Sequence, residues 1–133
     1  MISSKKQKIV FTILSIIAGL FGLLTVFSGF RVLLGLFEPG YLVFLPLLMF
    51  NTLMGFIYLL AGWFIRTRLE RGFMLTKLIA FINLGVLIVI GILFSLSDHL
   101  VAINSIYAMS FRTLVWFGIY FIIKFFLKRN LIN

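Results

Sequence analysis

The sequence predicts an all-α polytopic membrane protein, in which residues 1–133 form a single up-and-down bundle of four transmembrane helices. Three observations predict this fold. The chain is 63% hydrophobic and only 11% charged, with a mean hydropathy of +1.24, whereas soluble domains are about half apolar and about a quarter charged. Its apolar residues gather into four long runs, and its basic residues lie mainly in the short segments between them. This composition excludes a water-soluble enzyme and a disordered chain.

Each apolar run is long enough for one spanning helix, which needs about 20 residues to cross roughly 30 Å of hydrocarbon. We predict helices over about residues 9–36, 41–65, 73–96 and 105–127. Glu38, Pro39 and Gly40 are expected to end the first helix, because proline cannot continue a helix. The segment RTRLERG (66–72) is predicted as a basic loop between the second and third helices, and residues 100–104 as a short turn before the fourth.

The positions of the basic residues predict the orientation. The net charge is +9, from 12 Lys and Arg against 3 Asp and Glu. With four spans, every Lys and Arg except Arg31 and Arg112 falls on the side that holds both termini. Because basic loops stay on the cytoplasmic side, we expect both termini to be cytoplasmic, in a membrane of the bacterial inner-membrane type. A basic excess divided among short loops also favours membrane lipids over nucleic acid as partners.

The residue types that support enzyme chemistry are scarce. There is no Cys, one His and only 3 acidic residues, which leaves no thiolate nucleophile and few ligands for a metal centre. The sequence also has no glycine-rich phosphate loop, no serine nucleophile motif and no paired histidines for haem. We therefore expect no catalytic residue, no metal and no cofactor.

Two asparagines lie inside apolar runs, where a polar side chain is costly. Counted from the expected starts of the second and third helices, Asn51 and Asn83 both come out about 15 Å deep, at about 1.5 Å per residue. The simpler interpretation is a pair of amides that hydrogen-bond between the two helices. The alternative is a ligand or ion site at the centre of the bundle.

A second polar group is expected on the side away from the termini. Its members are Arg31, Glu38, Asp98, His99 and Arg112. Arg112 is expected roughly 10 Å below the start of the fourth helix, where arginine is costly unless it is paired or reaches the interface. The simpler interpretation is an ion pair with Glu38 or Asp98. The alternative is that Arg31 and Arg112 form a cationic pocket for an anionic headgroup or small acid, since guanidinium binds carboxylate and phosphate bidentately.

Asp98 and His99 are neighbours in the segment SLSDHLVAIN (95–104). Such a pair can take part in acid–base chemistry, but it cannot hold a metal ion by itself. Ser97 and Asp98 also suit the N-cap of a helix, and we favour this interpretation.

Two segments carry a family resemblance. The first helix has spaced glycines and ends GFRVLLG (29–35), and the second reads MGFIYLLAGWFIRTR (54–68) before a short basic turn into the third. In this order of features the chain resembles the DoxX-like group of small four-helix membrane proteins. The resemblance implies a membrane accessory or small-molecule-associated protein and carries over no catalytic residue. Where that group often has an acidic residue in the second helix, this chain has Asn51 nearby.

Three functional hypotheses follow. The leading one is a non-enzymatic subunit or assembly partner of a membrane complex that binds an anionic lipid headgroup near Arg31 and Arg112. Its partners would be membrane lipids and other membrane protein chains or a second copy of itself. The alternative is a homo-oligomeric channel or transporter for an anion or small solute, with Arg112 favouring anions. The third is an enzyme that acts on a lipid or quinone through Asp98 and His99.

Overall fold

The computed structural model describes residues 5–40, 43–97 and 101–132, with side chains through residue 128. These residues form four α-helices: α1 (Lys5–Leu33), α2 (Leu45–Thr67), α3 (Leu69–Leu96) and α4 (Ile103–Ile132). Within the described ranges there is no β-strand. All four helices are long and apolar enough to cross a membrane. The predicted all-α four-helix class is confirmed, and the chain is an integral multi-pass membrane protein.

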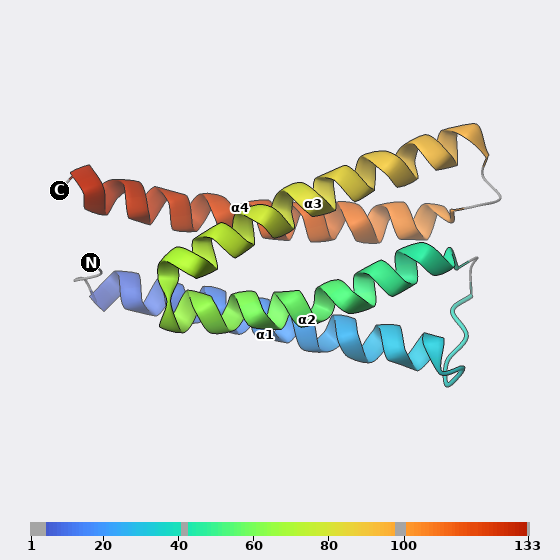
Figure 1. The fold of residues 1–133 in the computed structure, drawn as a ribbon, viewed down its shortest axis with the longest axis horizontal. Coiled ribbons are helices and arrows are strands. Elements are labelled where there is room, and N and C mark those ends of the chain that lie inside the picture. Colours follow the sequence, from blue (N-terminus) through green and yellow to red (C-terminus); the bar gives the residue numbers. More distant parts are fainter. Residues whose placement is uncertain (1–4, 41–42, 98–100, 133) are drawn as a thin grey trace.

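Consecutive helices run in opposite directions (Figure 1). The N- and C-terminal ends lie at one end of the bundle, together with the α2–α3 junction, and the other two connections lie at the opposite end (Figure 1). We call the first the basic end, after Arg66, Arg68 and Arg71 at the junction, and the second the far end. The α1–α2 pair packs most extensively and the α1–α4 pair least, so the bundle is closed least tightly along its α1–α4 side.

Helix α1 ends at Leu33, before the predicted stop at Pro39. Gly35 adopts a φ of +74°, a left-handed conformation that costs glycine little. The N–H of Leu36 then donates to the carbonyl of Arg31 at 2.9 Å, the hydrogen bond of a glycine-terminated helix end. Glycine therefore ends this helix earlier than proline would have.

Helix α2 begins at Leu45, later than the predicted start at residue 41. Phe44 is extended and Pro46 occupies the first turn, where a missing backbone N–H removes no helical hydrogen bond. The later start changes the depth of Asn51, which lies about 9 Å from the first residue of α2, at about 1.5 Å per residue. Asn51 is therefore nearer the far end than the sequence predicted.

The predicted loop RTRLERG is almost entirely helical. Helix α2 continues to Thr67, α3 begins at Leu69, and only Arg68 lies between them. The Arg68 N–H donates to the Phe64 carbonyl at 2.7 Å, and the Arg68 carbonyl accepts from the Gly72 N–H at 3.0 Å. Leu69 packs against the core, which explains why the helix starts in this basic segment.

The third connection also differs from its prediction. Helix α4 begins at Ile103, within the predicted turn, and Ser97 is the C-cap of α3, with its N–H bonded to the Leu93 carbonyl at 2.9 Å. Ser97 therefore ends α3, and the predicted N-cap at Ser97 and Asp98 stays a prediction, because residues 98–100 lie outside the described ranges. Asp98 and His99 lie outside the described residues.

The central core receives side chains from every helix. Among its buried members are Ala18 from α1, Tyr58 from α2, Ile79 from α3 and Trp116 from α4. A smaller apolar cluster of Leu47, Ile90, Val101 and Met109 lies toward the far end. Leu47 of this smaller cluster also lines a cavity between α1, α2 and α4.

Candidate functional site

A polar cavity of about 140 Å³ lies between α1, α2 and α4 in the half of the bundle nearer the far end. Its polar lining is Thr25 and Ser28 from α1, Asn51 and Thr52 from α2, and Ser105 and Arg112 from α4. Thr25, Ser28 and Gly29 follow the spacing that places residues on one helix face. Three helices thus turn hydroxyl, amide and guanidinium groups toward one space.

A second space of about 210 Å³ adjoins this cavity on the α1–α4 side. It shares Thr25, Ser28, Ala108 and Arg112 with the cavity. Its apolar walls are Phe21, Leu24 and Phe111. We call this second space the side opening, because its rim residues Ser28 and Ala108 are exposed.

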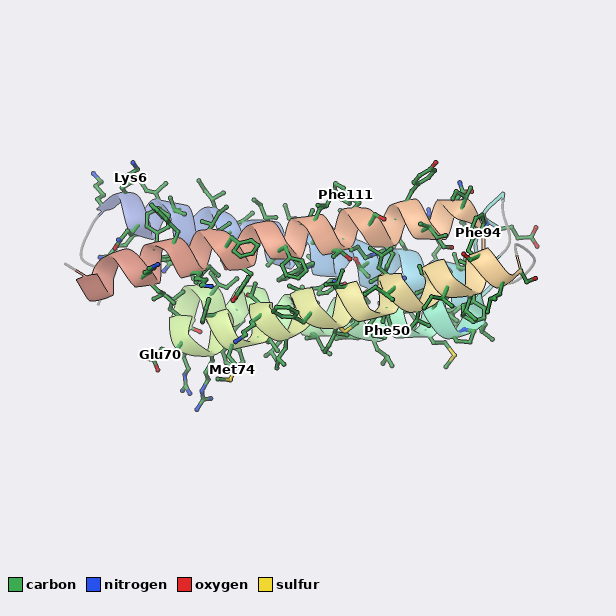
Figure 2. All side chains as sticks on the ribbon, turned by 90° about the horizontal axis from the view of Figure 1, so that it is seen from above. Lys6, Phe50, Glu70, Met74, Phe94 and Phe111 are labelled. Atoms are coloured by element: carbon green, nitrogen blue, oxygen red, sulfur yellow. The ribbon has the colours of Figure 1, made fainter. Side chains whose placement is uncertain are left out.

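The side opening lies where the bundle is most loosely closed. Of the neighbouring helix pairs, α1 and α4 pack least, and Phe111 lies on the face that these two helices share in Figure 2. The exposed residues Ser28, Ala108 and Phe111 line the opening on this face, so the cavity is open at the side of the bundle.

Arg112 is the cation of the cavity. It is half-buried and lies about 13 Å into α4 from Ile103, at about 1.5 Å per residue. The prediction that Arg112 stands at membrane depth, on the side away from the termini, agrees with this position.

The other polar groups around Arg112 include donors on Ser28, Asn51 and Ser105 as well as acceptors. The Asn51 carbonyl oxygen, Oδ1, is buried and has no hydrogen-bond partner among the described residues. The hydroxyls of Thr25 and Thr52 donate within their own helices, to the carbonyls of Phe21 at 2.7 Å and Leu48 at 2.8 Å. The cavity therefore combines one positive charge with oxygens that can accept hydrogen bonds.

The predicted pairing of Asn51 with Asn83 is wrong. The Asn83 amide is fully buried and bonds instead to the Tyr58 hydroxyl, which accepts from Nδ2 at 3.1 Å and lies 3.3 Å from Oδ1. The late start of α2 moves Asn51 toward the far end and leaves Tyr58 at the depth of Asn83. A tyrosine in mid-run was the sequence signal for this partner.

The predicted Arg31–Arg112 pocket does not form either. The Arg31 guanidinium lies over the rings of Phe37 and Phe27, at 4.1 and 5.8 Å from their centroids. It lines a different, apolar groove on α1. Since each residue turns a helix by about 100°, Arg31 is displaced from the face that carries Thr25 and Ser28.

Glu38 is exposed in the α1–α2 connection and is not among the residues that line the cavity. The predicted ion pair of Arg112 with Glu38 or Asp98 stays a prediction. The roles predicted for Asp98 and His99 stay predictions, because both residues lie outside the described ranges. Among the residues that are described, no three His, Asp or Glu side chains gather as a metal site would require.

Comparison with known proteins finds no matching family model and no significant match among curated proteins or solved structures. The DoxX-like resemblance therefore stays a prediction. The class that fold and site define is an all-α, four-helix integral membrane protein with a polar cavity that opens sideways.

Proposed function

We propose that this chain is a non-enzymatic membrane protein that binds an anionic lipid headgroup in the polar cavity at Arg112, as a subunit or assembly partner of a membrane complex. The observation that carries the proposal is the position of Arg112, at membrane depth in a polar cavity with an apolar side opening. A guanidinium binds phosphate through two parallel hydrogen bonds. The headgroup would lie at Arg112 and the acyl chains beside Phe21, Leu24 and Phe111.

The core below the cavity favours binding over passage through a single copy. Phe21 lines the side opening and contacts Tyr58 and Trp116, with ring centroids 5.6 and 6.4 Å apart. Tyr58 and Trp116 stack at 4.8 Å, and Asn83 bonds to Tyr58. These side chains fill the centre of the bundle between the cavity and the basic end.

Four glycines that are not used inside the bundle support the role of subunit. Gly19 on α1, Gly85 and Gly91 on α3 and Gly118 on α4 have nothing within 4 Å of the position a Cβ would occupy. Small residues allow close approach between membrane helices. We propose that they face other membrane chains or a second copy.

We also propose that the basic end is cytoplasmic, in a membrane of the bacterial inner-membrane type. Nitrogen-tipped side chains extend outward beside Glu70 and Met74 at this end (Figure 2). Short basic segments stay on the cytoplasmic side during insertion, and they gain about 1 kcal/mol per basic residue near anionic lipid.

Native mass spectrometry after gentle solubilisation tests both parts of the proposal. We expect phospholipid to remain bound, and Arg112→Gln to weaken its binding about tenfold, as loss of a charged hydrogen-bond partner does. Arg31→Gln is the matched control, because Arg31 lies outside the cavity, and should retain the lipid.

Equal lipid retention by both arginine variants would contradict headgroup binding at Arg112. The same spectra give the number and identity of the chains in each complex. Binding of this chain to other membrane proteins supports the subunit role, and a lone monomer contradicts it.

A further inference from the structure

We infer that the cavity selects an anionic lipid whose phosphodiester headgroup carries hydroxyl groups, as a glycerol-phosphate headgroup does. This inference rests on the proposed function and adds the class of headgroup. It follows from the inventory of donors and acceptors around Arg112.

One buried acceptor of the cavity lacks a hydrogen-bond donor among the described residues. The Asn51 Oδ1 is buried without a hydrogen-bond partner among the described residues, and a buried polar atom in this state destabilises the protein. In the hydrocarbon region water is scarce. A ligand hydroxyl at this position would satisfy the Asn51 carbonyl.

The two threonines strengthen the same requirement. Each hydroxyl has one hydrogen, and those of Thr25 and Thr52 are used on the carbonyls of Phe21 and Leu48. A hydroxyl oxygen keeps acceptor capacity when its hydrogen is donated. Both threonines line the cavity, and toward a ligand their hydroxyl oxygens would act as acceptors.

Among the described residues that line the cavity, Arg112 is the basic one, so the negative group of the ligand would bind there. A guanidinium donates two parallel hydrogen bonds to a phosphodiester. Choline has no N–H or O–H donor, and ethanolamine would bring a second cation next to Arg112.

The side opening indicates that the ligand is a lipid. Its walls are the apolar side chains of Phe21, Leu24 and Phe111, and it lies along the loosely packed α1–α4 side. Acyl chains attached to the headgroup would leave the cavity through this opening. A soluble phosphodiester has no acyl chains and would leave these apolar side chains without a contact.

The test compares two lipids of equal charge and equal acyl chains. Full-length protein in a neutral detergent is titrated with phosphatidylglycerol, which has two headgroup hydroxyls, or with phosphatidylethanol, which has none, and bound lipid is counted by native mass spectrometry. We expect phosphatidylglycerol to bind about fivefold more tightly, as one additional hydrogen bond provides. Asn51→Leu should abolish this difference, so that the variant binds the two lipids with equal affinity.

Asn104→Leu is the matched control, because Asn104 is exposed on α4 and outside the cavity lining, and it should keep the preference. Equal affinity of the wild-type protein for both lipids would overturn the inference, whatever the variants do. If the two lipids bind equally and Arg112→Gln weakens both, the proposed function stands although the headgroup inference fails. If Arg112→Gln weakens neither lipid, the proposed function and the headgroup inference both fail. Soluble glycerophosphoglycerol that binds as tightly as the lipid would overturn the lipid source.

Discussion

At the scale of single residues, the Tyr58–Asn83 pair shows how a polar group is accommodated in mid-membrane. The Asn83 amide is fully buried at the centre of α3, and the Tyr58 hydroxyl on α2 bonds to it. Tyr58 also stacks on Trp116 of α4, so one side chain joins the two helical hairpins. An amide left without a partner here would cost more than the bond itself contributes.

Tyr58→Phe should therefore destabilise the protein by about 1–3 kcal/mol, because it leaves the Asn83 amide buried without its partner. The double variant Tyr58→Phe, Asn83→Leu should lose less free energy of unfolding than the two single variants together. The expected coupling energy is about 0.6 kcal/mol and at most about 1.7 kcal/mol. Unfolding in mixed detergent micelles measures the free energy of unfolding of all three variants. Strict additivity would show that the two side chains do not interact.

At the scale of helices, the α1–α2 hairpin is held by close backbone approach. A Cβ on Gly22 would lie 2.7 Å from the Gly55 carbonyl oxygen and 2.8 Å from the Leu59 nitrogen, and both are backbone atoms that cannot rotate away. Ser15 donates from its hydroxyl to the Gly62 carbonyl at 2.7 Å across the same interface. Burial of apolar surface gives little gain between helices in lipid, so such contacts determine the packing.

We expect Gly22→Leu to separate α1 from α2 and to destabilise the bundle by about 1–3 kcal/mol, as overpacking does. Gly19→Leu is the matched control one turn away, because nothing lies within 4 Å of its Cβ position, and it should change stability by less than about 0.5 kcal/mol. Thermal unfolding in detergent compares the two. A similar loss at both positions would contradict the close-contact explanation.

At the scale of the whole molecule, the bundle is asymmetric. It is closed between α1 and α2 and loosely packed between α1 and α4, and the polar cavity opens on that loose side. The asymmetry makes one face of the protein different from the rest of its apolar surface. This arrangement supports the proposed access of a lipid from the side of the bundle.

Blocking the side opening should prevent lipid binding without unfolding the protein. Ala108 is exposed and lines the opening, so Ala108→Trp should lower lipid retention about tenfold by filling that space. Leu114→Trp places the same ring on an exposed part of α4, 72% accessible and outside the cavity, and should bind normally. Unchanged lipid retention in Ala108→Trp, measured by native mass spectrometry, would rule out entry by this route.

The orientation of the bundle is tested with single cysteines, because the natural chain has none. A membrane-impermeant maleimide added to intact cells should label Gly40→Cys, at the far end, and leave Arg68→Cys at the basic end unlabelled until the cells are opened. The opposite pattern would invert the proposed topology. Arg68 is the one residue between α2 and α3, which makes it a suitable reporter.

The sequence by itself determined the number of helices, the all-α class and the end of the bundle at which basic residues collect. Length, hydropathy and charge are properties of each segment alone, and the hydrocarbon thickness converts them directly into spans. Helix ends were predicted less well, because Gly35 and Pro46 act through local backbone geometry that hydropathy does not register.

Only the tertiary structure decided which polar residues meet. Arg31 and Arg112 were expected together, and so were Asn51 and Asn83. Instead Arg112 shares a cavity with Asn51, while Asn83 bonds to Tyr58. The physical reason is that each residue rotates a helix by about 100°, so a shift of one or two positions moves a side chain to another face. Depth can be counted along a sequence, but rotation is set by how helices pack.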